Sequence, residues 1–464
     1  MERNSQKLVD FCWHLNYEEI PEDVIKKTKQ CVLDYLGVAI GGAQTETGKN
    51  VIASSQWLGK EGKSRLLGTT QTASAIAAAF ANGTQSEVLE LQDGWRFGNI
   101  HACVVIPAAL AIADEKPTDG KKFLKSVVCG YELANRIAHT MHPNHLAKGY
   151  LPTGTAGTCG SALTSAIVLD ADLEETQQAV GIASFLLPVT TAENLWGGYS
   201  IKPFHSGQAA KEGIVSARLA MQKFEACPLE GSPERGRGWC DITTGEVKYE
   251  RLLLNLGTNY TISDVYFKVY PFCRHAHHAG EAALVLSRRL KETSGIGRVI
   301  VKTYDLAAGL LNRYPHYSSN QVAYQFSIPY VVSFALLRKN LSYLNYIVEN
   351  LHDEDIVALA KKVELIGDAE LTAVYPGVTP SIIEVYDKEG RLIDTQQCDM
   401  PKGDPRTPVT EEELEDKFNG LVIPAIGEKG ARELKDMIDH LERLEDVSAL
   451  GETVNRYLLA AGRK

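Results

Sequence analysis

Residues 267–278 read FKVYPFCRHAHH, and the sequence differs in character on the two sides of this stretch. Before it, apolar residues recur three and four positions apart, most clearly in 21–40 (PEDVIKKTKQCVLDYLGVAI), which is the spacing of one helix face. Gly41 and Gly42 follow directly, and we expect them to end this helix. Runs of alternating β-branched residues are hardly found before residue 265. The first part of the chain is therefore predicted to be mainly helical.

Alanine and other small residues are concentrated in four further stretches of this first part. Small side chains let helix backbones approach closely, so we expect buried helices that pack on one another at 73–81, 106–113, 161–169 and 208–220.

Strand patterns follow residues 267–278. Residues 298–304 (RVIVKTY) and 381–386 (SIIEVY) are typical of strands, and a turn leads from the second to a further strand at 391–393. Helices are predicted between them at 325–338 and 353–361. After 401–405 (PKGDP), Thr410 is a suitable cap for another helix, and 431–459 is predicted to be helical and to pack back on the first part. The fold class is therefore mainly α with an α+β part.

Composition limits the classes of partner. With 464 residues, the chain exceeds the roughly 250 to 300 residues of a single core, so two domains are expected. A net charge of −10 and a pI near 5.7 argue against a nucleic-acid partner, and no apolar run is long enough to predict a membrane span. The N-terminus lacks a signal-peptide pattern and the nine cysteines form no CxxC pair, so we expect a cytoplasmic protein with reduced thiols.

The segment 89–101 (LELQDGWRFGNIH) contains two acids, Glu90 and Asp93, together with Arg96 and His101. If Glu90 lies on a last helical turn, the three-residue spacing puts both acids on one side, and a loop can bring His101 back to them. An imidazole beside a carboxylate is a reasonable acid–base pair. A helix end with solvated acids and a buried histidine is an equally simple interpretation.

Two more segments could bind an anion. Residues 149–160 (GYLPTGTAGTCG) place Thr153 and Thr155 before a predicted helix, where free N–H groups suit a carboxylate, although small residues there also serve helix packing. Residues 201–211 (IKPFHSGQAAK) place Lys202 and His205 before another helix. Lys202 could hold a substrate carboxylate, and a solvated surface lysine is the alternative.

Basic residues are densest in 267–278, at the presumed domain boundary where ligand sites are common. We expect Lys268, Arg274 and His277 to form an anion pocket. The pattern HxHH lacks the spacing of a zinc site, so no metal is predicted. Cys273 is disfavoured as a nucleophile because nothing identifies an acyl substrate. Phosphate-binding motifs for a dinucleotide or ATP are missing from the sequence.

These segments, in this order, resemble the MmgE/PrpD family, which includes 2-methylcitrate dehydratase, cis-aconitate decarboxylase and iminodisuccinate epimerase. The resemblance covers nearly the whole chain. It is carried by HACVVIPAALAIADE from His101, GTAGTCGSA from Gly154, KPFHSGQAAKEG from Lys202, KVYPFCRHAHHAGEAA from Lys268, YQFSIPYVVSFAL from Tyr324 and MPKGDPRTPVTEEELEDKF from Met400.

The resemblance implies an all-helical domain with an inserted α+β lid. With the boundary set by the change of pattern, these are 1–267 with 403–464, and 268–402. It also implies a homodimer without metal or organic cofactor. The family's site falls on Glu90, Asp93, His101, Lys202, Lys268, Cys273, Arg274 and His277.

This chain departs from the family pattern at four places, which leaves the substrate open. Gln92-Asp93-Gly94 stands where Asp-Asp-Thr is frequent, and Glu90 stands where Asp is frequent. Leu151 replaces a common histidine, and Ala102 a common proline.

Our hypothesis is a lyase acting on a small di- or tricarboxylic acid. Lys202, Lys268, Arg274 and His277 would bind its carboxylates, while Asp93 and His101 exchange protons at the adjacent carbon and at the leaving hydroxyl. A hydro-lyase similar to 2-methylcitrate dehydratase is favoured, and an epimerase, a cis-aconitate decarboxylase-like enzyme and a non-catalytic ligand-binding protein are the alternatives. Further substrate contacts are expected from Glu90, Arg96, Thr153, Thr155, His205 and Cys273.

Overall fold

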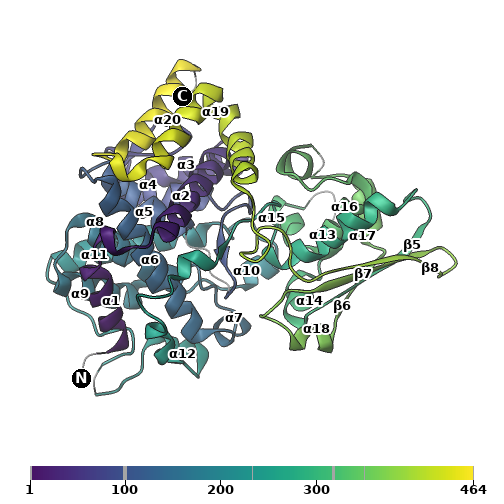
Figure 1. The fold of residues 1–464 in the computed structure, drawn as a ribbon, viewed down its shortest axis with the longest axis horizontal. Helices are drawn as coiled ribbons and strands as arrows, with labels where there is room; N and C mark the ends of the chain where they lie inside the picture. Colours follow the sequence, from purple (N-terminus) through teal and green to yellow (C-terminus); the bar gives the residue numbers. More distant parts are fainter. Residues whose placement is uncertain (1–2, 98–101, 233, 316–318, 350, 463–464) are drawn as a thin grey trace.

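The computed structural model describes residues 3–97, 102–232, 234–315, 319–349 and 351–462. It confirms the fold class: a large helical part stands beside a smaller part built on a four-stranded sheet (Figure 1). We call the first part the body and the second the lid. The body contains α1 (Asn4–His14), α2 (Glu22–Ala43), α3 (Glu46–Gly59), α4 (Ala75–Gln85), α5 (Ala102–Ala113), α6 (Gly120–Met141), α7 (Asn144–Ala147), α8 (Ala156–Leu169), α9 (Leu173–Leu186), α10 (Glu193–Trp196), α11 (Phe204–Met221), α12 (Trp239–Thr244), α19 (Glu411–Asp439) and α20 (Ser448–Ala460).

Helix α5 lies at the centre of the body, and all of its residues are buried. It packs against α4, α8 and α11, which come from the alanine-rich stretches. These predicted helices are confirmed. Close packing between α4 and α11 depends on Gly207, because a Cβ there would lie 2.1 Å from the carbonyl oxygen of Phe80. The body core also takes in apolar residues of α19 and α20, so the C-terminal helices return to the first part as expected.

The lid contains β5 (Ile296–Thr303), β6 (Val363–Gly367), β7 (Ser381–Asp387) and β8 (Leu392–Cys398) in the order β6-β5-β7-β8. The β5–β6 pair is parallel and the other two are antiparallel, with Val301 opposite both Leu365 and Ile383. Helices α13 and α16 pack on the sheet and on each other, over a core separate from that of the body. The lid helices are α13 (Arg274–Arg289), α14 (Asp305–Leu311), α15 (Gln321–Gln325), α16 (Ile328–Arg338), α17 (Glu354–Ala360) and α18 (Ala369–Ala373).

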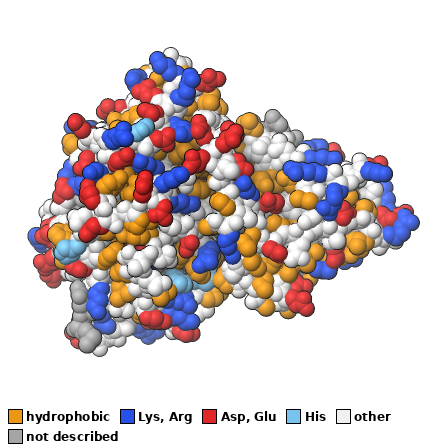
Figure 2. All heavy atoms as spheres, viewed as in Figure 1, with side chains coloured by type: hydrophobic (Ala, Val, Ile, Leu, Met, Phe, Trp, Pro, Cys, Tyr) orange, Lys and Arg blue, Asp and Glu red, His pale blue; other side chains and the backbone are white. Residues whose placement is uncertain are grey.

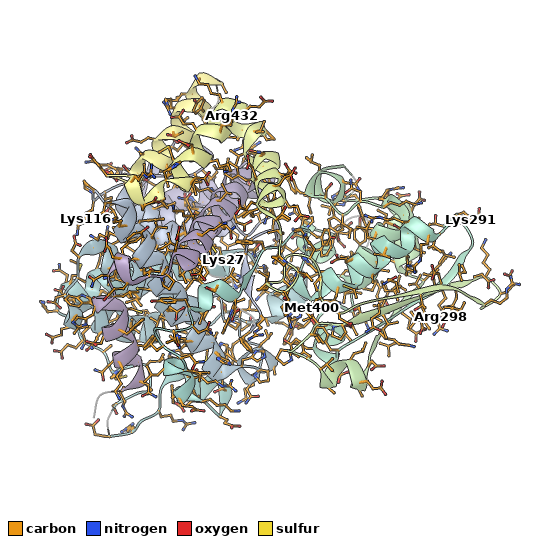
Figure 3. All side chains as sticks on the ribbon, in the orientation of Figure 1. Lys27, Lys116, Lys291, Arg298, Met400 and Arg432 are labelled. Carbon is orange, nitrogen blue, oxygen red and sulfur yellow. The ribbon has the colours of Figure 1, made fainter. Side chains whose placement is uncertain are left out.

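The chain passes from body to lid just after β4 (Val265–Tyr266), which pairs with β3 (Gly94–Trp95). It returns to the body where it leaves β8 for α19. Met400 lies on this second connection, at the junction of the two parts (Figure 3). Thr410 caps α19 as predicted: its hydroxyl accepts a hydrogen bond from the Glu413 N–H at 3.1 Å. A second short pair joins β1 (Ser64–Arg65) to β2 (Thr72–Ala73). No helix in the described ranges is both long and apolar enough to cross a bilayer.

The predicted end of the helix at Gly41 and Gly42 is wrong, because α2 continues to Ala43. The two glycines serve close contact rather than termination. A Cβ on Gly42 would lie 2.1 Å from the carbonyl oxygen of Gln85, and one on Gly41 would lie 2.9 Å from a Leu421 methyl group of α19. Helix α2 can therefore approach α4 this closely only if position 42 lacks a side chain, and the glycine at position 41 gives close contact with α19.

Two other predicted helices are interrupted. The stretch 325–338 contains the end of α15 and all of α16, because Ser327 accepts a hydrogen bond from the Tyr330 N–H at 3.1 Å and starts a new helix. The stretch 431–459 contains the end of α19 and most of α20, separated at 440–447. Strand β6 and helix α13 were not predicted from the pattern.

Gly42→Ala should lower the free energy of unfolding by about 1–3 kcal/mol, the cost of overpacking a core, because the Gln85 carbonyl belongs to the backbone and cannot move aside. Chemical denaturation measures this. The matched control is Gly420→Ala in α19, an exposed position where a Cβ meets nothing within 4 Å, which should be neutral or slightly stabilising. Equal stability of the two variants would refute the packing argument.

Candidate active site

A cavity of about 80 Å³ lies where body and lid meet. Its walls come from the segment after α4, the loop before α8, the segment before α11, and the chain from β4 into α13. The volume is well below the roughly 300 Å³ at which small-molecule pockets begin, so a ligand must separate some of the walls. The lining residues are Glu90, Leu146, Leu151, Pro152, Thr153, Leu195, Trp196, Lys202, His205, Tyr266, Lys268, Cys273, Arg274, His275, Leu310 and Phe326.

Two acids and two lysines form a buried ion cluster at this cavity: Glu87, Glu90, Lys202 and Lys268. Lys202 Nζ donates to Glu87 at 3.0 Å and also to Glu90. Lys268 Nζ donates to the second Glu90 oxygen at 2.7 Å. Since each of the four side chains is at most 2% exposed, every charge of the cluster is compensated by direct pairing and not by water.

Glu87, Glu90 and Lys202 stay ionised in spite of their burial. Burial alone would lower the pKa of Lys202, but the neighbouring Glu87 and Glu90 carboxylates outweigh it and raise that pKa. Burial likewise opposes ionisation of Glu87 and Glu90, yet the basic partners hold the pKa of both acids below the usual value. His205 and Ser206 complete the surroundings of Glu87: His205 Nε2 donates at 2.9 Å, and the Ser206 hydroxyl donates as well.

Local backbone structure decides which way the two predicted acids point. Helix α4 ends at Gln85, and Glu90 adopts a left-handed conformation with φ of 54°. The expected last helical turn with Glu90 and Asp93 on one side is therefore wrong. Glu90 points to the two lysines of the cavity, whereas Asp93 points into the body and does not line the cavity.

Asp93 is fully buried beside α5. Its carboxylate accepts hydrogen bonds from the Tyr131 hydroxyl at 2.6 Å and from the Ala102 N–H at 3.3 Å. Burial raises the pKa of Asp93 to about 7 against the effect of these bonds, and the nearby Asp34 carboxylate contributes in the same direction. Asp93 thus holds Ala102, the first residue of α5. His101, which precedes Ala102 in the sequence, lies outside the described residues.

The lid supplies Cys273, Arg274 and His275 to the cavity. Burial raises the pKa of the Cys273 thiol to about 11, so this sulfur is protonated at neutral pH. The Arg274 guanidinium lies 4.6 Å over the Tyr266 ring and 3.4 Å from Asp404. His277, by contrast, lies in the lid core with Nε2 3.1 Å from the Phe272 carbonyl oxygen and does not line the cavity.

Of the remaining predicted residues, some line the cavity and others do not. Thr153 lines the cavity, whereas the Thr155 hydroxyl is bonded to His145 Nε2 at 2.8 Å. Arg96 is exposed and covers the Phe97 ring at 5.0 Å. Backbone N–H groups of the glycine-rich loop bond within the loop: those of Gly154 and Thr155 donate to the Leu151 carbonyl, so they are not open to an anion.

Sequence reasoning missed Glu87, Ser206 and His275. The acids Glu87 and Glu90 are three residues apart, and Ser206 follows His205, so proximity to predicted residues was the available signal. Nothing in the pattern distinguishes His275 from the two histidines that follow it.

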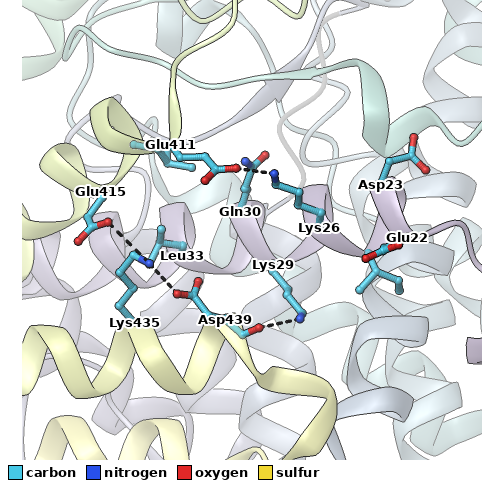
Figure 4. Close-up of a pocket in the computed structure, with 12 residues that line it drawn as sticks. Glu22, Asp23, Lys26, Lys29, Gln30, Leu33, Glu411, Glu415, Lys435 and Asp439 are labelled. Carbon is cyan, nitrogen blue, oxygen red and sulfur yellow. Dashed lines mark hydrogen bonds and ion pairs between the residues drawn. The ribbon is translucent and has the colours of Figure 1, made fainter.

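A larger hollow of about 810 Å³ lies on the surface between α2 and α19 (Figure 4). Its charged side chains pair with one another: Lys26 with Glu411, and Lys435 with Asp439 at 2.6 Å and Glu415 at 3.7 Å. These pairs are largely exposed, so the groove offers a ligand no desolvated charge. The smaller cavity is the better candidate site because its ions are buried.

The described part of the chain contains no group of three His, Cys, Asp or Glu residues placed to hold a metal ion. The side chains that do converge are ammonium, guanidinium and imidazole groups with hydroxyls nearby. Such donors bind carboxylates and stabilise negative charge that develops on them.

Comparison with known proteins identifies the class to which this fold and site belong. The family model of the MmgE/PrpD N-terminal domain matches residues 6–252, and that of the C-terminal domain matches residues 270–443. The chain belongs to the MmgE/PrpD family.

Individual relatives are distant but cover most of the chain. The chain is 24% identical to a cis-aconitate decarboxylase of Aspergillus terreus, over 95% of this chain and 94% of that protein. It is 26% identical to the cis-aconitate decarboxylase of Homo sapiens, over 94% and 91%. It is 23% identical to a probable 2-methylcitrate dehydratase of Saccharomyces cerevisiae, over 74% and 70%.

Asp93→Asn should flatten the pH dependence of stability. The folded-state pKa of about 7 lies above the unfolded value of about 3.9, so the wild type loses stability as the pH rises from about 4 to about 7. The variant cannot ionise and should be more stable at pH 8 by on the order of 1–3 kcal/mol. Thermal unfolding between pH 5 and 8 measures it, with Asp416→Asn on the exposed face of α19 as control. Parallel curves for wild type and Asp93→Asn would contradict a raised pKa.

Proposed function

We propose that the protein is a lyase that acts on a small di- or tricarboxylic acid by forming a carbanion next to a carboxylate. The observation that carries the proposal is the convergence of Lys202, Lys268 and Arg274 on one buried cavity. An enzyme of the lyase type agrees with the relatives in the family, which are decarboxylases and a dehydratase.

Lys202 and Lys268 each retain at least one N–H donor that the ion cluster does not use. An ammonium group has three N–H donors. Lys202 uses two of them on Glu87 and Glu90, and Lys268 uses one on Glu90. Both therefore keep a donor for a substrate carboxylate, and Glu90 holds the two nitrogens in fixed positions between which the carboxylate would bind.

Charge stabilisation follows from the same geometry. Removing a proton next to a carboxylate puts a second negative charge on the carboxylate oxygens. Cations that are already oriented in a water-poor cavity stabilise this charge without having to reorganise. In this proposal His101 exchanges the proton, and Asp93 fixes the start of α5 beside it through the Ala102 N–H.

The proposed carbanion leads to one of two products. Loss of water, as in a 2-methylcitrate dehydratase, remains the first candidate because proton transfer beside a carboxylate is its minimum requirement. Loss of carbon dioxide is the second candidate, and it is favoured by the cis-aconitate decarboxylases among the relatives that cover more than nine-tenths of the chain. Both pass through a carbanion held by the same cations.

We also propose a cytoplasmic homodimer. None of the nine cysteines forms a disulfide, which supports a reducing compartment. Phe185, Val189, Tyr199 and Ile201 are between 52% and 84% exposed, and large apolar side chains of this kind support burial against a second copy.

Incubation with citrate, 2-methylcitrate and cis-aconitate in heavy water tests the reaction. NMR should show deuterium in one of these acids or in its product, because a carbanion that does not expel hydroxide takes up a deuteron that comes from the solvent. A dehydratase adds vinyl signals, a decarboxylase releases carbon dioxide, and an epimerase gives exchange with the carbon skeleton intact. Binding by calorimetry without exchange or conversion would contradict the lyase and favour a ligand-binding protein.

Lys202→Met should reduce turnover by about a hundredfold or more, because it removes a cation that faces the developing charge. It should also destabilise the protein by about 3–5 kcal/mol, since Glu87 and Glu90 lose a buried partner. Adding Glu87→Gln removes the acid that has lost its lysine and keeps the Glu90–Lys268 pair, so it should recover part of the stability but none of the turnover.

Steady-state rates and chemical denaturation of the two single variants and the double variant separate these effects. Lys211→Met, in α11 and paired with Glu212, is the control and should keep wild-type turnover. Full activity of Lys202→Met would exclude the assigned site.

A further inference from the structure

Helix α13 carries three histidines, and they differ in what their ring nitrogens meet. His277 and His278 are fully buried in the lid, with Nε2 of His277 bonded to the Phe272 carbonyl and Nδ1 of His278 bonded to the Ser381 hydroxyl at 2.7 Å. His275 alone of the three lines the cavity. The imidazole that faces the cavity is therefore that of His275, next to Arg274, and not that of His277.

A tyrosine fixes the His275 ring. The Tyr304 hydroxyl is hydrogen-bonded to His275 Nδ1, and Tyr304 is fully buried. The Tyr304 ring stacks on Tyr375, with ring centroids 4.5 Å apart and planes inclined by 9°. Because Tyr304 is held on one side by the stack and on the other by the lid core, its hydroxyl holds the imidazole in one orientation.

The hydrogen bond also selects the tautomer. Within the described residues, the Tyr304 hydroxyl has no partner besides His275 Nδ1. If Nδ1 carried the proton, the buried phenol O–H would have nothing to donate to, and an unsatisfied buried donor costs about 1–3 kcal/mol. The favoured arrangement has Tyr304 donating to Nδ1, which places the imidazole proton on Nε2.

We propose that His275 is a catalytic hydrogen-bond donor: its Nε2–H donates to the substrate oxygen on which negative charge develops, with Tyr304 as the positioning residue. This rests on the proposed function and identifies a further member of the same site. Lys202, Lys268 and Arg274 bind carboxylates that are charged before the reaction as well. A neutral donor gains most when its acceptor becomes anionic, so it lowers the barrier more than it strengthens substrate binding.

The surroundings of His275 keep the imidazole neutral. Arg274 precedes it on α13, Lys268 lies on the segment before this helix, and His142 comes from the junction of α6 and α7. Tyr304 and Tyr375 contact it from the lid. Burial, reinforced by Arg274, His142 and Lys268, lowers the pKa of His275 to about 4. The ring therefore remains an uncharged donor across the neutral range.

Substitution of His275 tests the catalytic role. His275→Ala should lower kcat by about a hundredfold or more, the usual effect of losing one donor to a developing oxyanion, with KM changed less than about threefold. His275→Gln offers an amide N–H in place of Nε2–H and should recover at least about tenfold of that loss. Steady-state kinetics on whichever acid the wild type converts measures both, and circular dichroism checks the fold.

A matched pair tests the positioning role. Tyr304→Phe and Ser381→Ala each remove a hydroxyl bonded to Nδ1 of a histidine in α13, but only the first histidine faces the cavity. Tyr304→Phe should reduce kcat by about tenfold, and Ser381→Ala should leave it unchanged. If Tyr304→Phe has no effect or both lose activity equally, Tyr304 is not a positioning residue.

The two proposals fail in different ways. A wild-type protein that converts and exchanges none of the acids would overturn the proposed function and this inference with it. An active wild type whose His275→Ala variant keeps kcat within about threefold would overturn the inference alone. A rise in KM with unchanged kcat would also overturn it, because it would make His275 a binding residue.

Discussion

The buried ion cluster is the constraint on which the rest of the structure depends. Removing two carboxylates and two ammonium groups from water carries a large desolvation cost, which only direct pairing offsets. Glu87 and Glu90 follow α4, Lys202 precedes α11, and Lys268 lies where the chain enters the lid. The pairing is possible only if these three segments meet, so the charge cluster and the junction of body and lid require each other.

Helix α19, which follows the lid in the sequence, also stabilises this junction. Lys417 Nζ donates to the Asp34 carboxylate at 2.6 Å, to the Lys268 carbonyl at 2.8 Å and to the Leu91 carbonyl. One ammonium group from the C-terminal helix thus binds α2 and the two loops that carry Glu90 and Lys268. This explains why a helix that follows the lid in sequence belongs to the body in space.

The site does not attract an anion through its overall charge. The chain has a net charge of −10, and acidic and basic side chains are intermingled on the face shown in Figure 2. Within the cluster two acids neutralise two lysines. In the proposed function, recognition of an anionic substrate therefore comes from oriented N–H groups that remain available at short range, to which Arg274 adds a guanidinium on the lid side. This arrangement favours selectivity by geometry over long-range attraction.

The sequence by itself determined the alanine-rich helices of the body, three of the four strands of the lid sheet and the family, because local periodicity and motif order are properties of neighbouring residues. It also predicted that Lys202, Lys268 and Arg274 belong to one anion-binding site, and the structure shows that all three line the same cavity. Only the tertiary structure separated Glu90 from Asp93, since a single left-handed residue after α4 turns one acid to the cavity and leaves the other beside Tyr131. It likewise decided that His275 faces the cavity and His277 does not. Those outcomes depend on backbone conformation and on partners far away in the chain, such as Tyr304 and Ser381, which no local pattern contains.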